Sequence, residues 1–439
     1  MGAIQRYCVD SRQVRPGDCF VAIGGQRVDG HAYLSHAAQL GATSAWVSTT
    51  YEGPDFGLHL HRVNNPLIEL QKLAQVKLKN SPARIIAVTG SVGKTTTKEF
   101  LRTLLAPVFR TAVTEGNQNS QLGLPLFVLN QLQGDEEVVV LEMGMSKRGE
   151  LARLVSIAPP DIALLTAVSL AHAQNFSSLR EIAAAKGEIL SHPKTRIGII
   201  SADIEDLELL QATGSCRKET FSLRQLDSDW IAKELEPGLL QVRQPKDAPH
   251  LLGPLPITAP HFYHNLLGAV IVARNLGVSW EQIQASVTSL QLPPRRSERV
   301  VKGGVRFIND SYNAAPAAVV AALSSIELPS GEGRRIAVLG TMPELGAFSA
   351  ACHREVGELA LSTVDLLYCL GDETTAMQEI WLQRQREVFH FNDKDSLLRQ
   401  LEADLQAEDV VLVKGANVLE MWEIIEQFQP RNVPQGVDL

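Results

Sequence analysis

The stretch from Ile85 to Phe100, IIAVTGSVGKTTTKEF, constrains the fold more than any other part of this chain. Its first four residues are apolar and mostly branched, which predicts a buried strand. Gly90 and Gly93 then make a turn, and Lys94 opens a segment with an apolar helical face. This order is typical of a phosphate-binding loop, in which backbone N–H groups hold phosphate oxygens, the lysine reaches the outer phosphates and the Thr95 hydroxyl binds Mg²⁺. The alternative is a glycine turn with a solvated lysine, which the flanking strand and helix disfavour.

Length and composition restrict the class of protein. A chain of 439 residues is expected to form about three domains. The net charge of −8 argues against nucleic-acid binding, and no apolar stretch is long enough to span a bilayer. The first residues lack the features of a signal peptide. The five cysteines are scattered without metal-binding spacing, which predicts reduced thiols in a cytoplasmic protein.

The order of apolar runs and turns predicts three α/β units. Residues 1–80 form a small module, and residues 81–292 a larger unit built on the phosphate loop. The third unit, residues 293–439, begins at a proline pair of the kind that often separates domains. Its apolar strands are expected at 305–308, 336–339, 366–370 and 410–413. Because they alternate with helical stretches, we expect a parallel, Rossmann-like sheet.

Two side chains of the second unit are candidate metal ligands. Glu142 ends the apolar strand Val138–Leu141, where a carboxylate beside a phosphate loop is well placed for Mg²⁺. The alternative is an ordinary acid at a strand end. Lys186 lies on the apolar face of the predicted helix Ser178–Leu190. A buried lysine has a lowered pKa and, as a neutral amine, can condense with carbon dioxide to a metal-bridging carbamate. The pattern alone favours a lysine whose ammonium reaches water along its stem.

Three further polar residues have two possible roles each. His172 follows a predicted strand, but a lone histidine is more often a core or surface residue than a ligand. Asn265 precedes the apolar run 266–276 and can bind a base edge or cap the helix, and the pattern favours capping. Arg296 follows the proline pair and can swing onto a phosphate or belong to a solvated basic linker.

Several stretches together resemble the Mur ligases of bacterial peptidoglycan synthesis. The resemblance extends from Asp10 to about residue 425. It is carried by DSRQVRPGDCFVAIGG, VTGSVGKTTTKE, GNQNSQLGLP, LEMGMSKRGE, AHAQNFSS, AAAKGEI, HN at positions 264 and 265, NDSYNAAP, MPELG and LVKG. The phosphate loop alone fits many enzymes, whereas this ordered set is specific.

The resemblance implies an ATP-dependent amide ligase of the bacterial cytoplasm. Within the family, the stretches are most similar to the member that adds D-alanyl-D-alanine to a UDP-N-acetylmuramoyl-tripeptide. In that reaction ATP phosphorylates the terminal carboxylate of the tripeptide, and the dipeptide amine displaces phosphate from the acyl phosphate. The first domain would bind the UDP end, and the third would receive the dipeptide and close over the site. ATP, Mg²⁺ and both substrates are the expected ligands, and we expect a monomer.

The resemblance also assigns roles to individual residues. The nucleotide would be bound by Gly90, Ser91, Val92, Gly93, Lys94, Thr95, Thr96, Asn265, Arg296 and Asp310. Thr95 and Glu142 would hold one Mg²⁺. His172 and a carbamylated Lys186 would hold a second, which reverses the interpretation that the pattern alone favours. The expected catalytic residues are Lys94, His172, Lys186 and Arg296. Substrate contacts would come from Ser11, Arg12, Asn119, Tyr312, Asn313 and Lys414.

The chain departs from the family pattern at positions near the expected site. The family usually has Asn where this chain has Ser120, Gly268 and Ala315, and Asp where it has Asn309 and Thr341. It usually has Ser and Arg where this chain has Ala416 and Asn417.

Three other functions are alternatives to the dipeptide-adding ligase. They are another ligase of the superfamily, such as one that adds glutamate to a folate, a simple phosphate-loop ATPase, and an ATP-binding scaffold without catalysis.

Overall fold

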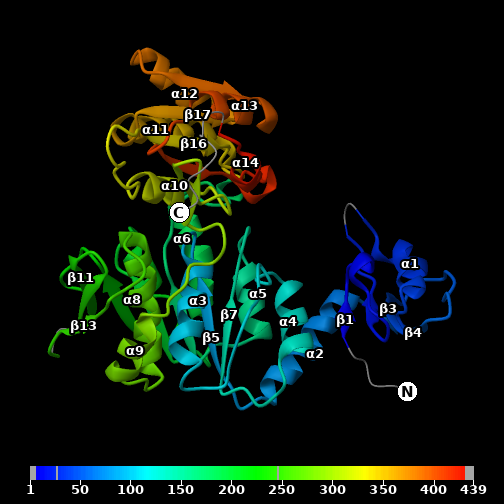
Figure 1. Ribbon diagram of the computed structural model, residues 1–439. Helices are drawn as coiled ribbons and strands as arrows, with labels where there is room; N and C mark the ends of the chain where they lie inside the picture. Colours follow the sequence, from blue (N-terminus) through cyan, green and yellow to red (C-terminus); the bar gives the residue numbers. More distant parts are fainter. Residues whose placement is uncertain (1–5, 26–27, 245–246, 431–439) are drawn as a thin grey trace.

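The computed structural model describes residues 6–25, 28–244 and 247–430, which form three α/β units with one sheet each (Figure 1). The first sheet is parallel in the order β1-β2-β3-β4. Its elements are β1 (Tyr7–Cys8), β2 (Cys19–Val21), α1 (Leu34–Gln39), β3 (Ser44–Ser48) and β4 (His59–Val63). Helix α2 (Pro66–Lys79) follows and packs against α4 (Gly123–Gln131) of the second unit. The predicted boundaries after residues 80 and 292 stay predictions.

The second sheet has nine strands in the order β13-β12-β11-β10-β9-β8-β5-β7-β6. Its strands are β5 (Arg84–Thr89), β6 (Thr111–Val113), β7 (Val138–Glu142), β8 (Ile162–Leu165), β9 (Ile197–Ser201), β10 (Arg217–Ser222), β11 (Trp230–Glu236), β12 (Leu239–Arg243) and β13 (His250–Leu252). The strands from β6 to β11 pair in parallel. Strands β12 and β13 add an antiparallel extension, which the sequence did not predict.

Helices cover both faces of the second sheet. They are α3 (Lys94–Leu105), α4, α5 (Glu150–Ile157), α6 (Leu179–Gly187), α7 (Leu207–Gln211), α8 (Pro260–Asn275) and α9 (Trp280–Val287). Ile86 and Val88 of β5 face the core of α3, α8 and α9, whereas Ile85 and Ala87 face the core on the opposite side. A strand between two helical layers must be apolar at every position, so the run 85–88 is confirmed as a buried strand.

The third sheet has the order β14-β15-β19-β16-β17-β18. Its strands are β14 (Glu298–Lys302), β15 (Val305–Asn309), β16 (Arg335–Gly340), β17 (Leu366–Leu370), β18 (Val388–Phe391) and β19 (Val410–Lys414). Its helices are α10 (Pro316–Leu323), α11 (Ser349–Thr363), α12 (Thr375–Gln383), α13 (Lys394–Asp404) and α14 (Trp422–Gln427). The parallel sheet is confirmed, with β14 as an antiparallel edge strand.

Two predictions from composition can be compared with the structure. All five cysteines are free thiols in buried positions. Within the described ranges, the helices are too short or too polar to cross a membrane.

Candidate active site

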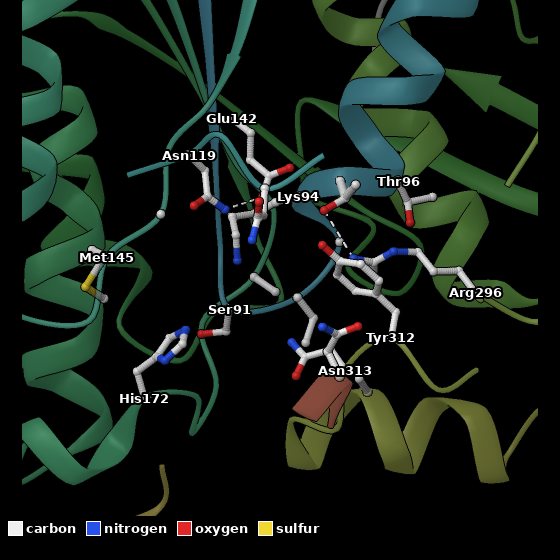
Figure 2. A pocket seen from close by; sticks show the side chains of 18 of the residues that line it. Ser91, Lys94, Thr96, Asn119, Glu142, Met145, His172, Arg296, Tyr312 and Asn313 are labelled. Carbon is white, nitrogen blue, oxygen red and sulfur yellow. Dashed lines mark hydrogen bonds between the residues drawn. The ribbon is translucent and has the colours of Figure 1, made fainter. Parts of the chain in front are cut away.

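The carboxyl ends of the second and third sheets face one cavity of about 820 Å³ (Figure 2). The second sheet contributes the phosphate loop after β5, Glu142 at the end of β7, and the loop after β8 that carries His172. The third sheet contributes Asp310 after β15 and Lys414 at the end of β19. Ligands of open α/β sheets bind at this edge, so the topology brings together side chains that are far apart in the sequence.

The phosphate loop is held in its conformation by neighbouring segments. Gly93 has a φ of +85°, and a Cβ atom there would lie 2.3 Å from Oδ1 of Asn265. The Thr166 hydroxyl donates to the Val92 carbonyl at 2.6 Å. The Ser91 hydroxyl donates to the Ser169 carbonyl at 2.9 Å, which ties the phosphate loop to the loop of His172. The ammonium of Lys94 donates to the Gly90 carbonyl at 2.8 Å and therefore points along the phosphate loop.

Gly93→Ala is expected to weaken ATP binding about tenfold to a hundredfold, because the new methyl group adds strain and collides with Asn265. Isothermal titration with a non-hydrolysable ATP analogue measures this effect. Gly149→Ala is the matched control, since Gly149 has a φ of +86° but no heavy atom within 4 Å of the place that a new methyl group would occupy. Equal affinities of the two variants would show that the collision is unimportant.

Glu142 fits the metal role better than that of an ordinary acid at a strand end. It is 2% exposed, and its Oε1 accepts a hydrogen bond from Asn119 Nδ2 at 2.8 Å (Figure 2). Its Oε2 is buried and has no hydrogen-bond partner among the described residues. A buried carboxylate oxygen without a donor is a good ligand for a cation.

Glu142 is not part of a larger cluster of metal-ligating side chains among the described residues. The described part of the chain contains no group of three or more His, Cys, Asp or Glu side chains that could hold a metal ion. Mg²⁺ is commonly held by one or two carboxylates together with substrate phosphates. The donor set around Glu142 therefore suits a metal ion that arrives with a nucleotide.

Lys186 is buried in α6, so the expectation that its ammonium reaches water is wrong. The residue is 2% exposed. Burial lowers the pKa of Lys186 well below its ordinary value, and the positive charge of Lys94 lowers it further. Both effects favour the neutral amine that a carbamate requires. Lys186 does not line the cavity.

His172 lines the cavity and is contacted by the third unit. Its backbone is left-handed, with a φ of +57°, and its Nδ1 is in contact with a carboxylate oxygen of Glu344. Burial lowers the pKa of His172, and the charge of Glu344 opposes that shift. The Gln174 N–H also donates to the Glu344 carbonyl at 2.9 Å. Glu344 lies in the MPELG stretch, but nothing in the sequence assigned that residue a role.

Arg296 reaches the phosphate loop, so the interpretation as a solvated linker is wrong. Its Nη2 donates to the Thr95 hydroxyl at 3.1 Å, and its guanidinium lies 4.6 Å from the centre of the Tyr312 ring (Figure 2). Both neighbours in the sequence, Arg295 and Ser297, have left-handed backbones. This strained linker directs Arg296 from the third unit towards the second.

Arg296→Ala is expected to raise the KM for ATP about tenfold to a hundredfold, because the guanidinium that donates to the Thr95 hydroxyl would no longer be available to the ATP phosphates. Initial rates over a range of ATP concentrations measure the effect. Arg299→Ala is the control, since Arg299 on β14 is exposed and pairs with Glu327 at 3.5 Å. An unchanged KM in the Arg296 variant would contradict the assigned contact.

Asn265 does not cap a helix, contrary to the interpretation that the pattern favoured. Helix α8 begins at Pro260 with Ala259 as its N-cap, so Asn265 lies in the second turn and against Gly93. His261 and His264 line the cavity from the same helix, and the sequence assigned neither of them a role, although His264 belongs to the HN pair of the resemblance. Burial lowers the pKa of each imidazole to about 4, so both are neutral at pH 7.

The remaining predicted residues fall into two groups. The cavity is lined by Ser91, Val92, Thr96, Asn119, Asp310, Tyr312, Asn313 and Lys414. Lys414 donates to Asp310 Oδ2 at 2.5 Å and to the Asn313 carbonyl at 3.0 Å, so it is held by its neighbours.

Ser11 and Arg12 belong to the first unit and do not line the cavity. Ser11 contacts His36, and Arg12 pairs with Asp10 at 2.8 Å. Their substrate contacts stay predictions.

One cavity is surrounded by a phosphate loop, a buried carboxylate and an arginine from a second α/β unit. These features define a nucleotide-dependent enzyme with several domains. Family models match all three units. The Mur ligase family catalytic domain matches residues 3–77, the Mur ligase middle domain residues 88–273, and the Mur ligase glutamate ligase domain residues 295–417.

Full-length relatives agree with these matches. The UDP-N-acetylmuramoyl-tripeptide–D-alanyl-D-alanine ligase of Bacillus subtilis is 30% identical, over 97% of this chain and 93% of the relative. The crystal structure of MurF from Acinetobacter baumannii superposes with a TM-score of 0.86 at 26% identity, over 97% of this chain and 93% of that chain. MurF from Thermotoga maritima in complex with ADP gives 0.82 at 30% identity and covers 97% of both chains. The chain belongs to the Mur ligase family.

Proposed function

We propose that this chain is the ATP-dependent ligase that adds D-alanyl-D-alanine to UDP-N-acetylmuramoyl-tripeptide in cytoplasmic peptidoglycan precursor synthesis. The observation that carries the proposal is the shared cavity, in which Arg296 of the third unit meets the phosphate loop of the second. The name of the Bacillus subtilis relative mentions both UDP-N-acetylmuramoyl-tripeptide and D-alanyl-D-alanine. The ADP in the Thermotoga maritima structure supports ATP as the nucleotide.

In the proposed reaction, the tripeptide carboxylate attacks the γ-phosphorus of ATP and becomes an acyl phosphate, while the bond to the β–γ bridging oxygen breaks and ADP leaves. Lys94 and Arg296 neutralise the phosphate charges, and Asn265 and Asp310 contact the nucleoside. When bound, Mg²⁺ supplies Lewis-acid stabilisation of the transferring phosphoryl group. Thr95 and Glu142 would hold one ion, and His172 and carbamylated Lys186 a second.

The second half of the reaction is an aminolysis. The dipeptide amine attacks the acyl carbon, and the tetrahedral intermediate expels inorganic phosphate to leave the amide. Tyr312, Asn313 and Lys414 of the third unit would position the dipeptide, while Asn119 contacts the muramoyl-peptide and Ser11 and Arg12 the UDP end. Closure of the third unit protects the acyl phosphate from water. We propose that the monomer carries out the whole reaction.

A panel of amine acceptors distinguishes this activity from other ligases of the superfamily. The protein is incubated with ATP, Mg²⁺ and UDP-N-acetylmuramoyl-tripeptide together with D-alanyl-D-alanine, L-glutamate, L-lysine or diaminopimelate, and products are identified by mass spectrometry. We expect the pentapeptide product with the dipeptide alone. Product with another acceptor would replace the proposal by another ligase of the superfamily.

The acyl phosphate predicts a specific isotope transfer. If both oxygens of the terminal carboxylate of the tripeptide are ¹⁸O, one labelled oxygen becomes the bridge to phosphorus and leaves with the phosphate. We therefore expect one ¹⁸O atom in each inorganic phosphate released, measured by ³¹P NMR or mass spectrometry. Unlabelled phosphate would contradict an acyl phosphate, and labelled AMP would indicate an adenylate instead.

A further inference from the structure

Lys98 is a fully buried lysine next to the phosphate loop, and neither the motif nor the proposed reaction gives it a role. It lies on α3, one helical turn after Lys94, and its side chain is 0% exposed. Lysine is almost never fully buried unless it is paired. The partners of its ammonium therefore explain why the residue is there.

The ammonium of Lys98 has two backbone carbonyls and two carboxylates as neighbours. It donates to the carbonyl of Thr114 at 2.7 Å and to the carbonyl of Gly116 at 2.9 Å, just after β6. Its Nζ lies 3.5 Å from Oε2 of Glu142 at the end of β7. Glu99 is a more distant carboxylate, at 3.9 Å. Glu142 forms no other ion pair within the described ranges.

The same segment also binds Glu142 directly. The Glu142 N–H donates to the Thr114 hydroxyl at 3.0 Å, and Asn119, further along the segment, donates to Oε1. Lys98, the segment 114–119 and Glu142 therefore form one connected unit behind the cavity. Figure 2 shows its cavity-facing part, where Asn119 and Glu142 lie side by side.

We propose that Lys98 is a positioning residue that holds the Glu142 carboxylate and the 114–119 segment in the geometry that binds the metal ion. The inference rests on the proposed metal role of Glu142. Two backbone carbonyls fix the ammonium, so its charge lies close to Oε2 while that oxygen has no hydrogen-bond donor among the described residues. Lys98 thus compensates a buried carboxylate without occupying the oxygen that a cation needs.

A buried lysine that only closes a loop is the competing explanation, and the chain offers a matched control for it. Lys77 on α2 also donates to two backbone carbonyls, those of Leu129 and Leu132, at 3.2 and 2.8 Å. It does not line the cavity. Lys77→Met therefore removes a comparable structural contact, whereas Lys98→Met also removes the charge beside Glu142.

The test measures metal binding without turnover. Mn²⁺ is titrated into the full-length protein saturated with AMP-PNP, and its Kd is measured by electron paramagnetic resonance. The relevant site is the one that Glu142→Gln abolishes. We expect Lys98→Met to raise the Kd of this site about tenfold to a hundredfold, and Lys77→Met to leave it unchanged. A Kd in Lys98→Met within twofold of wild type would overturn the inference. If wild-type protein shows no Glu142-dependent site, the proposed metal role itself fails instead.

A double variant covers the case in which Lys98→Met does not fold. Lys98→Met leaves the buried carboxylate of Glu142 without its counter-charge and should lower the thermal midpoint. Adding Glu142→Gln removes that carboxylate charge and is expected to reverse part of the decrease. If Lys98→Met only removed the hydrogen bonds to the two carbonyls, adding Glu142→Gln would not restore the thermal midpoint. A double variant that is no more stable than Lys98→Met would contradict the charge compensation on which the inference depends.

Discussion

Replacing Lys94 with methionine is expected to lower kcat/KM about 10³-fold. The ammonium of Lys94 lies in the phosphate loop and lines the cavity, and Lys94 directly precedes Thr95, the proposed Mg²⁺ ligand. Burial lowers the pKa of Lys94, while the charge of Glu142 opposes that shift. Bound phosphates would favour the charged form further, so the side chain is suited to neutralise charge that grows in the transition state.

Single-turnover phosphate release at saturating ATP separates this loss from weaker nucleotide binding. The control is Lys147→Met, because Lys147 is exposed and does not line the cavity. We expect the control to have wild-type kinetics. Activity of Lys94→Met within tenfold of wild type would show that the loop does not act on a transferring phosphoryl group.

The second large effect is expected at Lys186. Lys186→Ala should lower activity about 10²-fold to 10³-fold, since it removes a proposed metal ligand and the charge that it brings to the site. The carbamate itself can be observed directly. Protein equilibrated with ¹³C-bicarbonate should give a carbamate carbon signal in the NMR spectrum of wild type, and Lys186→Ala should lack it.

Chemical rescue tests whether a carboxylate-like group is what the site needs. A short carboxylate such as acetate or propionate should restore part of the activity of Lys186→Ala. Failure of every short carboxylate, together with an absent ¹³C signal in wild type, would argue that Lys186 acts as an amine or only fills space. Carbon dioxide reacts only with the neutral amine of Lys186, whose pKa is lowered by burial. Because the amine is protonated at lower pH, the amount of carbamate is expected to decrease as the pH falls.

Much of the fold follows from local patterns in the sequence. The run 85–88, the glycine turn and the helix after it needed no tertiary information, because a central parallel strand is apolar on both faces. Strands β15, β16, β17 and β19 of the third sheet were predicted for the same reason, whereas the less buried β14 and β18 were not. The antiparallel pairing of β12 and β13 was not predicted, since these short, half-exposed strands lie in a polar stretch whose strands could not be ordered from the sequence.

The candidate site was predicted less completely than the fold, because its geometry depends on contacts across units. Asn265 resembled a helix cap only because the preceding turn of α8, PHFYH, is less apolar than the rest of the helix. Glu344 gained its significance from contact with His172, which no local pattern encodes. Lys98 was assigned no role from the sequence, because its partners Thr114 and Glu142 are distant in the sequence and follow from the placement of β6 and β7.

The resemblance to a family supplied what the patterns could not decide. Spacing alone favoured an exposed end for Lys186 and a capping role for Asn265, and the structure contradicts both interpretations. The burial of Lys186 supports the role that the resemblance implied. Departures such as Ala416 line the same cavity, so they lie where the dipeptide is proposed to bind.

The most direct test of the central claim is phosphate release from ATP with Mg²⁺ while each substrate is omitted in turn. We expect release to require both UDP-N-acetylmuramoyl-tripeptide and D-alanyl-D-alanine, with one phosphate for each amide bond formed. Release with ATP alone would indicate a simple ATPase. ATP binding without release under any combination would contradict the ligase function and leave an ATP-binding scaffold.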